Sequence, residues 1–318
     1  MDNLCHTLAG AVLAEAGLRR RTPLAVPTAL IGANLPDLDA LAYLRDPVFA
    51  LGVRRGWTHG LLAMLVLPVL LAALVLGWDR LVRRRGDQRA DPMGLLTVAA
   101  VAVLSHPLLD LLNTYGVRLL MPFSGRWFHA DALFIVDPWL WLLFGVGAAL
   151  AIRRRRRGAS PEQSARPARG ALAVACGYIG LMLLSNVAGR GIARREAARA
   201  GVAPVGDLML APVPVNPFRR LVVLVTRGGY RRGTFRWTAS PHLTLEPGLV
   251  AKGLGSPAAK AAAASPEGAA FLGWSRFPAA VIPPGEPSVV RLYDLRYAGP
   301  EGGWASVDVG VDSAPGGP

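Results

Sequence analysis

Hydrophobic residues form long uninterrupted runs in the first part of the chain and short alternating runs in the rest. Four runs approach the ~20 residues that a helix needs to cross the hydrocarbon core of a membrane. They are residues 61–77, 94–112, 133–152 and 171–188. Residues 25–44 are a fifth, less uniform candidate, and residues 6–18 suit a half-helix buried against its neighbours. We therefore expect a mainly α, membrane-embedded helical bundle of five or six segments.

The remainder of the chain has strand-like alternation, Gly/Pro turns and no run long enough to span lipid. The pattern therefore predicts two domains, a membrane-embedded helical domain over residues 1–189 and a smaller β-rich soluble domain over residues 190–318. Composition agrees with a membrane protein, because 52% of the 318 residues are hydrophobic and only 18% are charged.

Two β-hairpins are predicted in the second domain. The first joins residues 219–226 to 234–237 through a Gly-Gly turn, and the second joins 288–297 to 304–311. Between them, residues 255–270 are rich in Ala, Gly, Ser and Pro, a composition typical of a mobile loop. No catalytic constellation appears in this half, which could form a lid or bind a partner.

The formal net charge of +14 comes mainly from arginine, since Lys252 and Lys260 are the only lysines. Such a charge could indicate nucleic-acid binding, but much of the excess lies in short loops between apolar segments, where membrane orientation explains it better. We therefore expect membrane lipid, and no nucleic acid, as a partner. The two cysteines, Cys5 and Cys176, are not expected to form a disulfide.

Arginine clusters follow the first, third and fifth predicted segments, at residues 19–21, 80–89 and 153–169. If these loops are cytoplasmic, the N-terminus and the second domain lie outside a bacterial inner membrane. Four arginines within residues 190–199 argue for the opposite placement of the second domain. Three basic loops against one favour an extracytoplasmic C-terminal half.

Histidine and aspartate recur where the hydrophobic segments begin or end, and this threading brings them to the outer face. The set is His6, Asp37, Asp39, His59, His106, Asp110, His129, Asp131 and Asp137. Ionisable groups at membrane boundaries are costly and usually functional, and a mixture of imidazoles and carboxylates suits a divalent metal, with Zn²⁺ as the first choice. We predict a metal site with one or more ions.

The predicted ligands are His6, Asp37, His59, His106 and Asp110. His106 and Asp110 are four residues apart, so both side chains lie on one face of a helix. Each ligand also has a structural alternative: a helix cap at the start of the chain for His6, a histidine–carboxylate pair at a helix end, an aspartate-rich turn at residues 37–39, or an interfacial histidine at position 59.

Four further residues are assigned roles in catalysis. Asp39 or Asp131 could act as a general base, and Arg118 or Arg126 could hold the phosphate of a substrate. A role as a loop residue or a helix cap explains Asp131 equally well, and an ordinary polar helix end also explains Arg118.

Several ordered motifs carry a resemblance to a known family. They are Asp2-Asn3-Leu4 with His6-Thr7, Ile31 to Asp39, Arg55-Gly56-Trp57-Thr58-His59-Gly60, and Ser105 to Asp110 with Asn113-Thr114-Tyr115-Gly116. Over roughly residues 1–150 the chain resembles the YdjM-type family of bacterial inner-membrane proteins, which are described as metal-dependent hydrolases. That family is in turn distantly similar to the zinc-dependent phospholipase C and P1 nuclease group.

The resemblance implies a metal site built on His106 and Asp110, with His6, Asp37 and His59 as partners. Our leading hypothesis is a membrane-bound metal-dependent hydrolase with its site at the outer face, acting on a phosphoester or lipid-like substrate. The alternative is a non-catalytic, metal-stabilised membrane scaffold or an ion permease. The sequence favours no oligomeric state.

Overall fold

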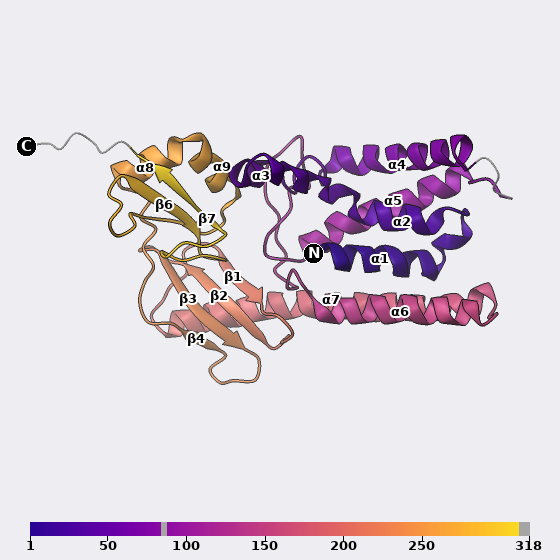
Figure 1. Ribbon diagram of the computed structural model, residues 1–318. Coiled ribbons are helices and arrows are strands. Elements are labelled where there is room, and N and C mark those ends of the chain that lie inside the picture. Colours follow the sequence, from indigo (N-terminus) through magenta and orange to yellow (C-terminus); the bar gives the residue numbers. More distant parts are fainter. Residues whose placement is uncertain (84–87, 312–318) are drawn as a thin grey trace, which may run out of the picture. The chain divides into compact units, whose positions relative to one another are not determined.

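The computed structural model describes residues 1–83 and 88–311, and the chain divides into two compact units (Figure 1). Unit 1 comprises Met1–Asp39, Arg55–Val187 and Ala211–Pro217. Unit 2 comprises Ala40–Arg54, Ala188–Leu210 and Phe218–Pro318. Arg84 and Arg85 of the second basic cluster lie outside the described residues.

Unit 1 is helical (Figure 1). Its elements are α1 (Asn3–Ala16), η1 (Leu18–Arg20), α2 (Ala25–Asn34), the start of η2 (Leu35–Leu44), α4 (Leu61–Leu81), α5 (Pro92–Leu111), α6 (Pro138–Arg156) and most of α7 (Pro161–Arg199). Helix α1 packs against α2 and α6, α2 packs against α5, and α5 packs against α4. Helix α5 therefore contacts α2 and α4, and it also contacts α1.

Three helices among the described residues, α4, α5 and α7, are long and apolar enough to cross a membrane. On α4, Leu65 and Leu74 are 72% and 63% exposed, as expected for side chains that face lipid. Helices α1 and α2 have only 14 and 10 residues. The number of membrane segments beyond these three stays a prediction.

The expected segment over 25–44 changes conformation midway. Helix α2 ends at Asn34, and the 3₁₀ helix η2 follows directly. Pro36 at this junction has no backbone N–H to continue the α-helical ladder. As a result, Asp37 and Asp39 stand on a tighter turn than a regular α-helix would provide.

Small residues let α1, α2 and α5 approach closely. A Cβ atom on Gly10 would lie 2.7 Å from the carbonyl oxygen of Ala29, and one on Gly32 would lie 3.0 Å from Cβ of Ala102. Glycine and alanine at such crossings are typical of helices that pack within a membrane. This packing brings the start of α1, the end of α2 and the end of α5 together.

Unit 2 contains two antiparallel sheets and short helices. The first sheet has the order β1-β2-β3-β4 and the second the order β5-β6-β7. The strands are β1 (Leu208–Pro212), β2 (Arg219–Val225), β3 (Tyr230–Arg236), β4 (Leu243–Leu245), β5 (Pro278–Val281), β6 (Val289–Asp294) and β7 (Ser306–Gly310); the helices are α3 (Pro47–Val53), α8 (Pro257–Ala264) and α9 (Pro266–Trp274).

Both predicted hairpins are confirmed. In the first, Val222 pairs with Gly233 and Leu224 with Arg231. In the second, Val290 pairs with Val309 across β6 and β7. The alternation buries Val222 and Leu224 with Phe235 in one apolar core.

The prediction of a mobile loop over residues 255–270 is wrong, because most of this segment is helical. Ser256 and Ser265 each cap a helix that has proline at its first position. The Ser256 hydroxyl accepts a hydrogen bond from the N–H of Ala259, and that of Ser265 accepts one from Gly268. These Ser-Pro starts, followed by alanine, outweigh the flexible composition.

Candidate metal centre

Four side chains of unit 1 converge on one buried point. Asp37 comes from η2, His59 from the turn before α4, and His106 and Asp110 from the last two turns of α5. One ligand atom of each lies within 4.8 Å of all the others. His59, His106 and Asp110 are fully buried, and Asp37 is 7% exposed.

The separations fit a single small cation. The Nε2 atoms of His59 and His106 are 3.1 Å apart, and Asp110 Oδ2 lies 3.3 Å from the first and 3.5 Å from the second. Asp37 Oδ1 lies 3.7 Å from His106 Nε2 and 4.0 Å from His59 Nε2. Tetrahedral ligands at ~2.0 Å from Zn²⁺ are roughly 3.3 Å apart, so little movement would complete the site.

The two oxygens of Asp110 have different surroundings. Oδ1 contacts the Met1 amino group, Arg55 Nη2 at 2.9 Å and His6 Nε2 at 3.3 Å. Oδ2 is buried and accepts no hydrogen bond from the described residues. A buried carboxylate oxygen without a donor is costly, and a cation at the centre of the cluster would satisfy it.

Hydrogen bonds orient both histidines of this cluster. His106 Nδ1 lies 2.6 Å from the carbonyl oxygen of Ala33, so it carries the proton and leaves Nε2 as the ligand atom. His59 Nδ1 lies 2.9 Å from Thr58 Oγ1, which donates to Asp39 Oδ2 at 2.8 Å. Burial lowers the pKa of His59 to about 4, so the imidazole is neutral at pH 7, as a metal ligand requires.

The predicted ligand His6 lies beside the four-residue group. Its ring stacks on that of His106 with centroids 3.7 Å apart, and its Nε2 faces Oδ1 of Asp110. His6 is fully buried. The structure therefore brings all five predicted ligands together. His6 lies at Oδ1 of Asp110, whereas His59 and His106 lie at Oδ2.

Arg55 is a site residue that our reading of the sequence missed. Its guanidinium contacts Asp110 Oδ1 and donates to Asn113 Oδ1 at 3.0 Å, and its backbone has a φ of 51°. This φ is uncommon for a residue other than glycine. Arg55 belongs to the motif Arg55-Gly56-Trp57-Thr58-His59-Gly60 that carries the family resemblance, and its position beside His59 was the available clue.

Asp39 is placed to orient His59. Its Oδ2 accepts from the N–H of Arg55 at 2.7 Å and from Thr58, and lies 3.4 Å from His59 Nδ1. The second base candidate, Asp131, is buried but is not among the four residues whose ligand atoms converge.

The two candidate phosphate ligands lie against aromatic rings. The guanidinium of Arg118 is 4.9 Å from the centre of the Trp127 ring, and that of Arg126 is 5.3 Å from the Phe128 ring. The backbone N–H of Arg118 donates to the carbonyl of Arg55 at 2.8 Å, which ties this loop to the cluster.

The remaining members of the sequence set have structural contacts. The carboxylate of Asp137 caps α6 and accepts a hydrogen bond from the Tyr178 hydroxyl at 3.1 Å. His129 lies against Gly116, where a side chain would collide with the imidazole. Among the described residues, neither belongs to the converging group.

The fold and the cluster define a helical membrane protein with a buried His/Asp group that could hold a metal ion. Residues 1–190 match the YdjM inner membrane protein family, and the chain belongs to that family. The match confirms the resemblance seen in the sequence motifs and extends it through most of α7.

One curated relative is the uncharacterized protein YfhP of Bacillus subtilis (strain 168). The two are 26% identical over 113 residues, which cover 36% of this chain and 32% of that protein. The match thus spans about a third of the relative's own length. No solved structure matches the chain.

Proposed function

We propose that this protein is a membrane-bound, metal-dependent hydrolase whose His/Asp cluster faces the outer side of the inner membrane. The observation that carries the proposal is the convergence of Asp37, His59, His106 and Asp110 within 4.8 Å around an unsatisfied carboxylate oxygen. Carboxylate and imidazole together are a typical ligand set for Zn²⁺.

The metal would be held by Asp37 Oδ1, the Nε2 atoms of His59 and His106, and Asp110 Oδ2. When bound, a divalent ion supplies a Lewis acid that activates water and polarises the group under attack. Arg55 offsets the charge on the other oxygen of Asp110, which the Met1 amino group also contacts. Asp39 and Thr58 fix the ring of His59.

The outer-face placement rests on the two ends of α1 and α5. His6 is in the first turn of α1, whereas Arg19, Arg20 and Arg21 follow its last turn. His106 and Asp110 are near the end of α5, far from the basic loop that precedes it. If the basic loops are cytoplasmic, the cluster lies toward the outer leaflet.

An amphiphilic phosphoester is the substrate class we favour. The site is near a lipid–water boundary by this topology, and Arg118 and Arg126 are on the loop that joins α5 to α6. A guanidinium binds phosphate through paired N–H donors. Asp39 or Asp131 remains the proposed general base, although the contacts of Asp39 suit an orienting role better.

One observation favours a second candidate, the non-catalytic metal-stabilised scaffold. His59, His106 and Asp110 have no solvent exposure, and four side-chain ligands would fill a tetrahedral shell. Structural zinc sites are closed in this way, whereas catalytic sites keep an open position. An ion permease has less support, because α4 is apolar from Leu61 to Gly77.

The test is metal analysis of the purified protein, followed by hydrolysis assays with phosphomonoester, phosphodiester and phospholipid substrates. We expect about one divalent ion per chain. His106→Ala should lose the metal and all hydrolysis while the helices stay folded, because lipid and packing hold them. His242→Ala, which removes a histidine of unit 2, is the matched control and should keep both.

Asp39→Asn tests the orienting contact. It should weaken metal binding by about 10- to 100-fold, whereas Asp46→Asn, at the cap of α3, should not change it. Stoichiometric metal without hydrolysis, and a loss of thermal stability on metal removal, would support the scaffold. Full metal content in His106→Ala would contradict both candidates.

A further inference from the structure

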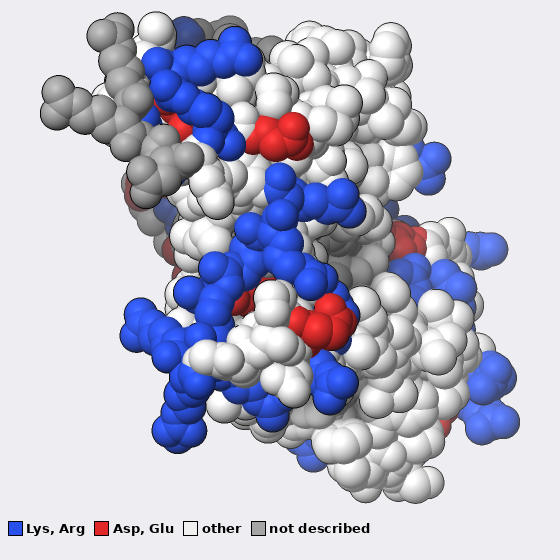
Figure 2. Space-filling view, turned by 90° about the vertical axis from the view of Figure 1, so that its right-hand side faces the viewer, with Lys and Arg blue, Asp and Glu red and all other residues white. Residues whose placement is uncertain are grey.

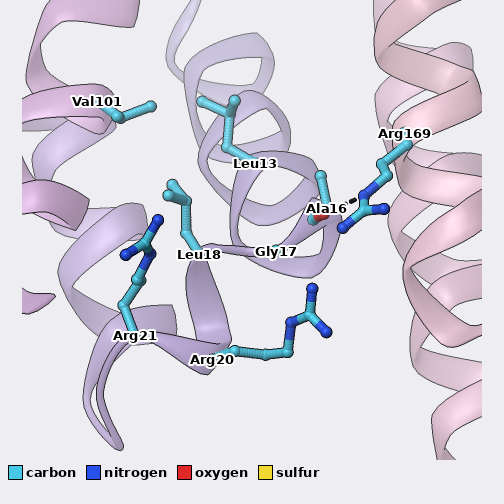
Figure 3. Close-up of a pocket in the computed structure, with 8 residues that line it drawn as sticks. All are labelled: Leu13, Ala16, Gly17, Leu18, Arg20, Arg21, Val101 and Arg169. Atoms are coloured by element: carbon cyan, nitrogen blue, oxygen red, sulfur yellow. Dashed lines mark hydrogen bonds between the residues drawn. The ribbon is translucent and has the colours of Figure 1, made fainter. Parts of the chain in front are cut away.

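A second pocket lies in unit 1, toward the end of α1 that is remote from the His/Asp cluster (Figure 3). Its volume is about 540 Å³. Apolar and basic side chains share its wall. They are Leu13, Leu18 and Val101, and Arg20, Arg21 and Arg169.

Arginines gather on the same end of the helices. Figure 2 shows this end of the molecule with many blue basic side chains and few acidic ones. Arg19–Arg21 follow α1, and the last turn of α6 contains Arg153–Arg156. The pocket therefore lies where apolar helix surface meets the basic end of the helices.

The basic wall carries more positive charge than its neighbours neutralise. Glu162 pairs with Arg169 and, at 3.3 Å, with Nη2 of Arg20. Nε of Arg169 donates to the carbonyl oxygen of Ala16 at 2.8 Å, the bond drawn in Figure 3. The guanidinium of Arg21 has no hydrogen bond or ion pair with any described residue. Two of the three guanidinium groups thus share one carboxylate, and the third has none among the described residues.

We propose that this pocket binds the phosphate of an anionic membrane lipid. Guanidinium groups bind phosphate oxygens through paired N–H donors, and basic pockets between membrane helices on the cytoplasmic side are known to take anionic headgroups. The lipid's glycerol and acyl chain would lie along Leu13, Leu18 and Val101. A soluble phosphate compound shares the headgroup chemistry but would leave that apolar wall unused.

This site is separate from the proposed catalytic cluster. His6 and Ala16 lie at opposite ends of α1, and no residue of the pocket belongs to the converging ligand group. A lipid bound here would hold η1, α1 and α7 together from the basic side. Its loss should therefore leave the metal content unchanged.

The experiment is native mass spectrometry of the detergent-purified full chain with phosphatidylglycerol, phosphatidylcholine or inorganic phosphate added. We expect bound phosphatidylglycerol, little phosphatidylcholine and no competition by inorganic phosphate at equal concentration. The double variant Arg20→Gln/Arg21→Gln should bind phosphatidylglycerol about 10-fold more weakly. It keeps both contacts of Arg169, so the helix packing should survive.

The matched control is Arg156→Gln/Arg157→Gln, which removes the same charge from the same end but outside the pocket. It should bind phosphatidylglycerol like the wild type. Equal weakening of both double variants would show general charge attraction and overturn the pocket. Equal binding of phosphatidylcholine would overturn the anionic headgroup, and displacement by inorganic phosphate would overturn the lipid. Metal content, measured in parallel, reports whether each variant is folded.

Discussion

Each unit buries an aspartate side chain, and the two carboxylates have different kinds of partner. In unit 1, Asp110 is surrounded by Arg55, the Met1 amine and three histidines. In unit 2, Asp294 is fully buried and accepts hydrogen bonds from Arg296 and Ser275. The second carboxylate is satisfied by protein alone, whereas the first keeps one oxygen without a donor. Burial of charge by itself therefore does not identify a metal site.

We predict that the stability of unit 2 depends on pH through Asp294. Burial alone would raise the pKa of Asp294, but Arg296 and the hydrogen bonds hold it below its usual range. The stabilisation that ionised Asp294 gives to unit 2 is therefore complete above the unfolded pKa of ~4. It is lost as the pH falls through the lower pKa of Asp294 in the folded state. Hydrogen exchange of the β6 peptide, corrected for intrinsic rates, should accelerate below about pH 4.

The variants make this prediction specific. Asp294→Asn should expose β6 to exchange at pH 7 and flatten the acid response. Asp308→Asn removes a similar aspartate–arginine pair, but Asp308 is 43% exposed, so solvent screening should leave a much smaller effect. An unchanged acid response in Asp294→Asn would refute the assignment of this pH dependence to Asp294.

The spacing between helices, more than the polar side chains, sets the geometry of the cluster. His6 is on α1, Asp37 follows α2, and His106 is on α5. Their convergence depends on Gly10 and Gly32, which leave no room for a side chain between these helices. The 3₁₀ helix η2 then turns Asp37 and Asp39 toward His59.

We predict that Gly10→Ala separates α1 from α2. The new Cβ would lie 2.7 Å from the backbone oxygen of Ala29, which cannot rotate away. Overpacking of this kind costs about 1–3 kcal/mol, and it should weaken metal binding by moving α1. Thermal unfolding and metal content measure the two effects.

Gly77→Ala on α4 is the control, because nothing lies within 4 Å of its added Cβ. It should match the wild type or be slightly more stable, since alanine favours a helix. Equal behaviour of the two variants would show that the close approach at Gly10 does not hold the cluster together.

Helix α7 begins in unit 1, and its last residues belong to unit 2. Helix α7 has 39 residues, roughly 58 Å at 1.5 Å per residue, so it extends well beyond a ~30 Å hydrocarbon core. Arg190 near its end pairs with Asp207 at 3.0 Å, and Glu196 accepts from the N–H of Leu243. Arg190 therefore has a partner within folded structure and weighs less as a signal for the inside.

We therefore predict that the basic loops are cytoplasmic and that the C-terminal half lies outside. In a variant with Cys5 and Cys176 replaced by alanine, a cysteine at Gly125 or Gly302 should react with an impermeant thiol reagent in intact cells. One at Arg157, in the basic loop between α6 and α7, should react only after the membrane is opened. Labelling at position 157 with protection at 302 would invert the orientation.

The sequence alone determined that a helical part precedes a β-rich part, the two hairpins, and the set of histidines and aspartates from which the cluster is drawn. These follow from hydrophobic periodicity and from the cost of placing histidine and aspartate at membrane boundaries, both of which are local properties. The Ser-Pro starts of α8 and α9 were also local signals, but the surrounding flexible composition concealed them.

Only the tertiary structure decided which of those side chains share one centre. Asp37 and His106 are distant in sequence, and their meeting depends on the close approach of α2 to α5 at Gly32, which no single segment encodes. The role of Arg55 was likewise hidden, because nothing in its own segment shows that it meets Asp110. Periodicity specifies which face of a helix is buried, whereas packing specifies what that face meets.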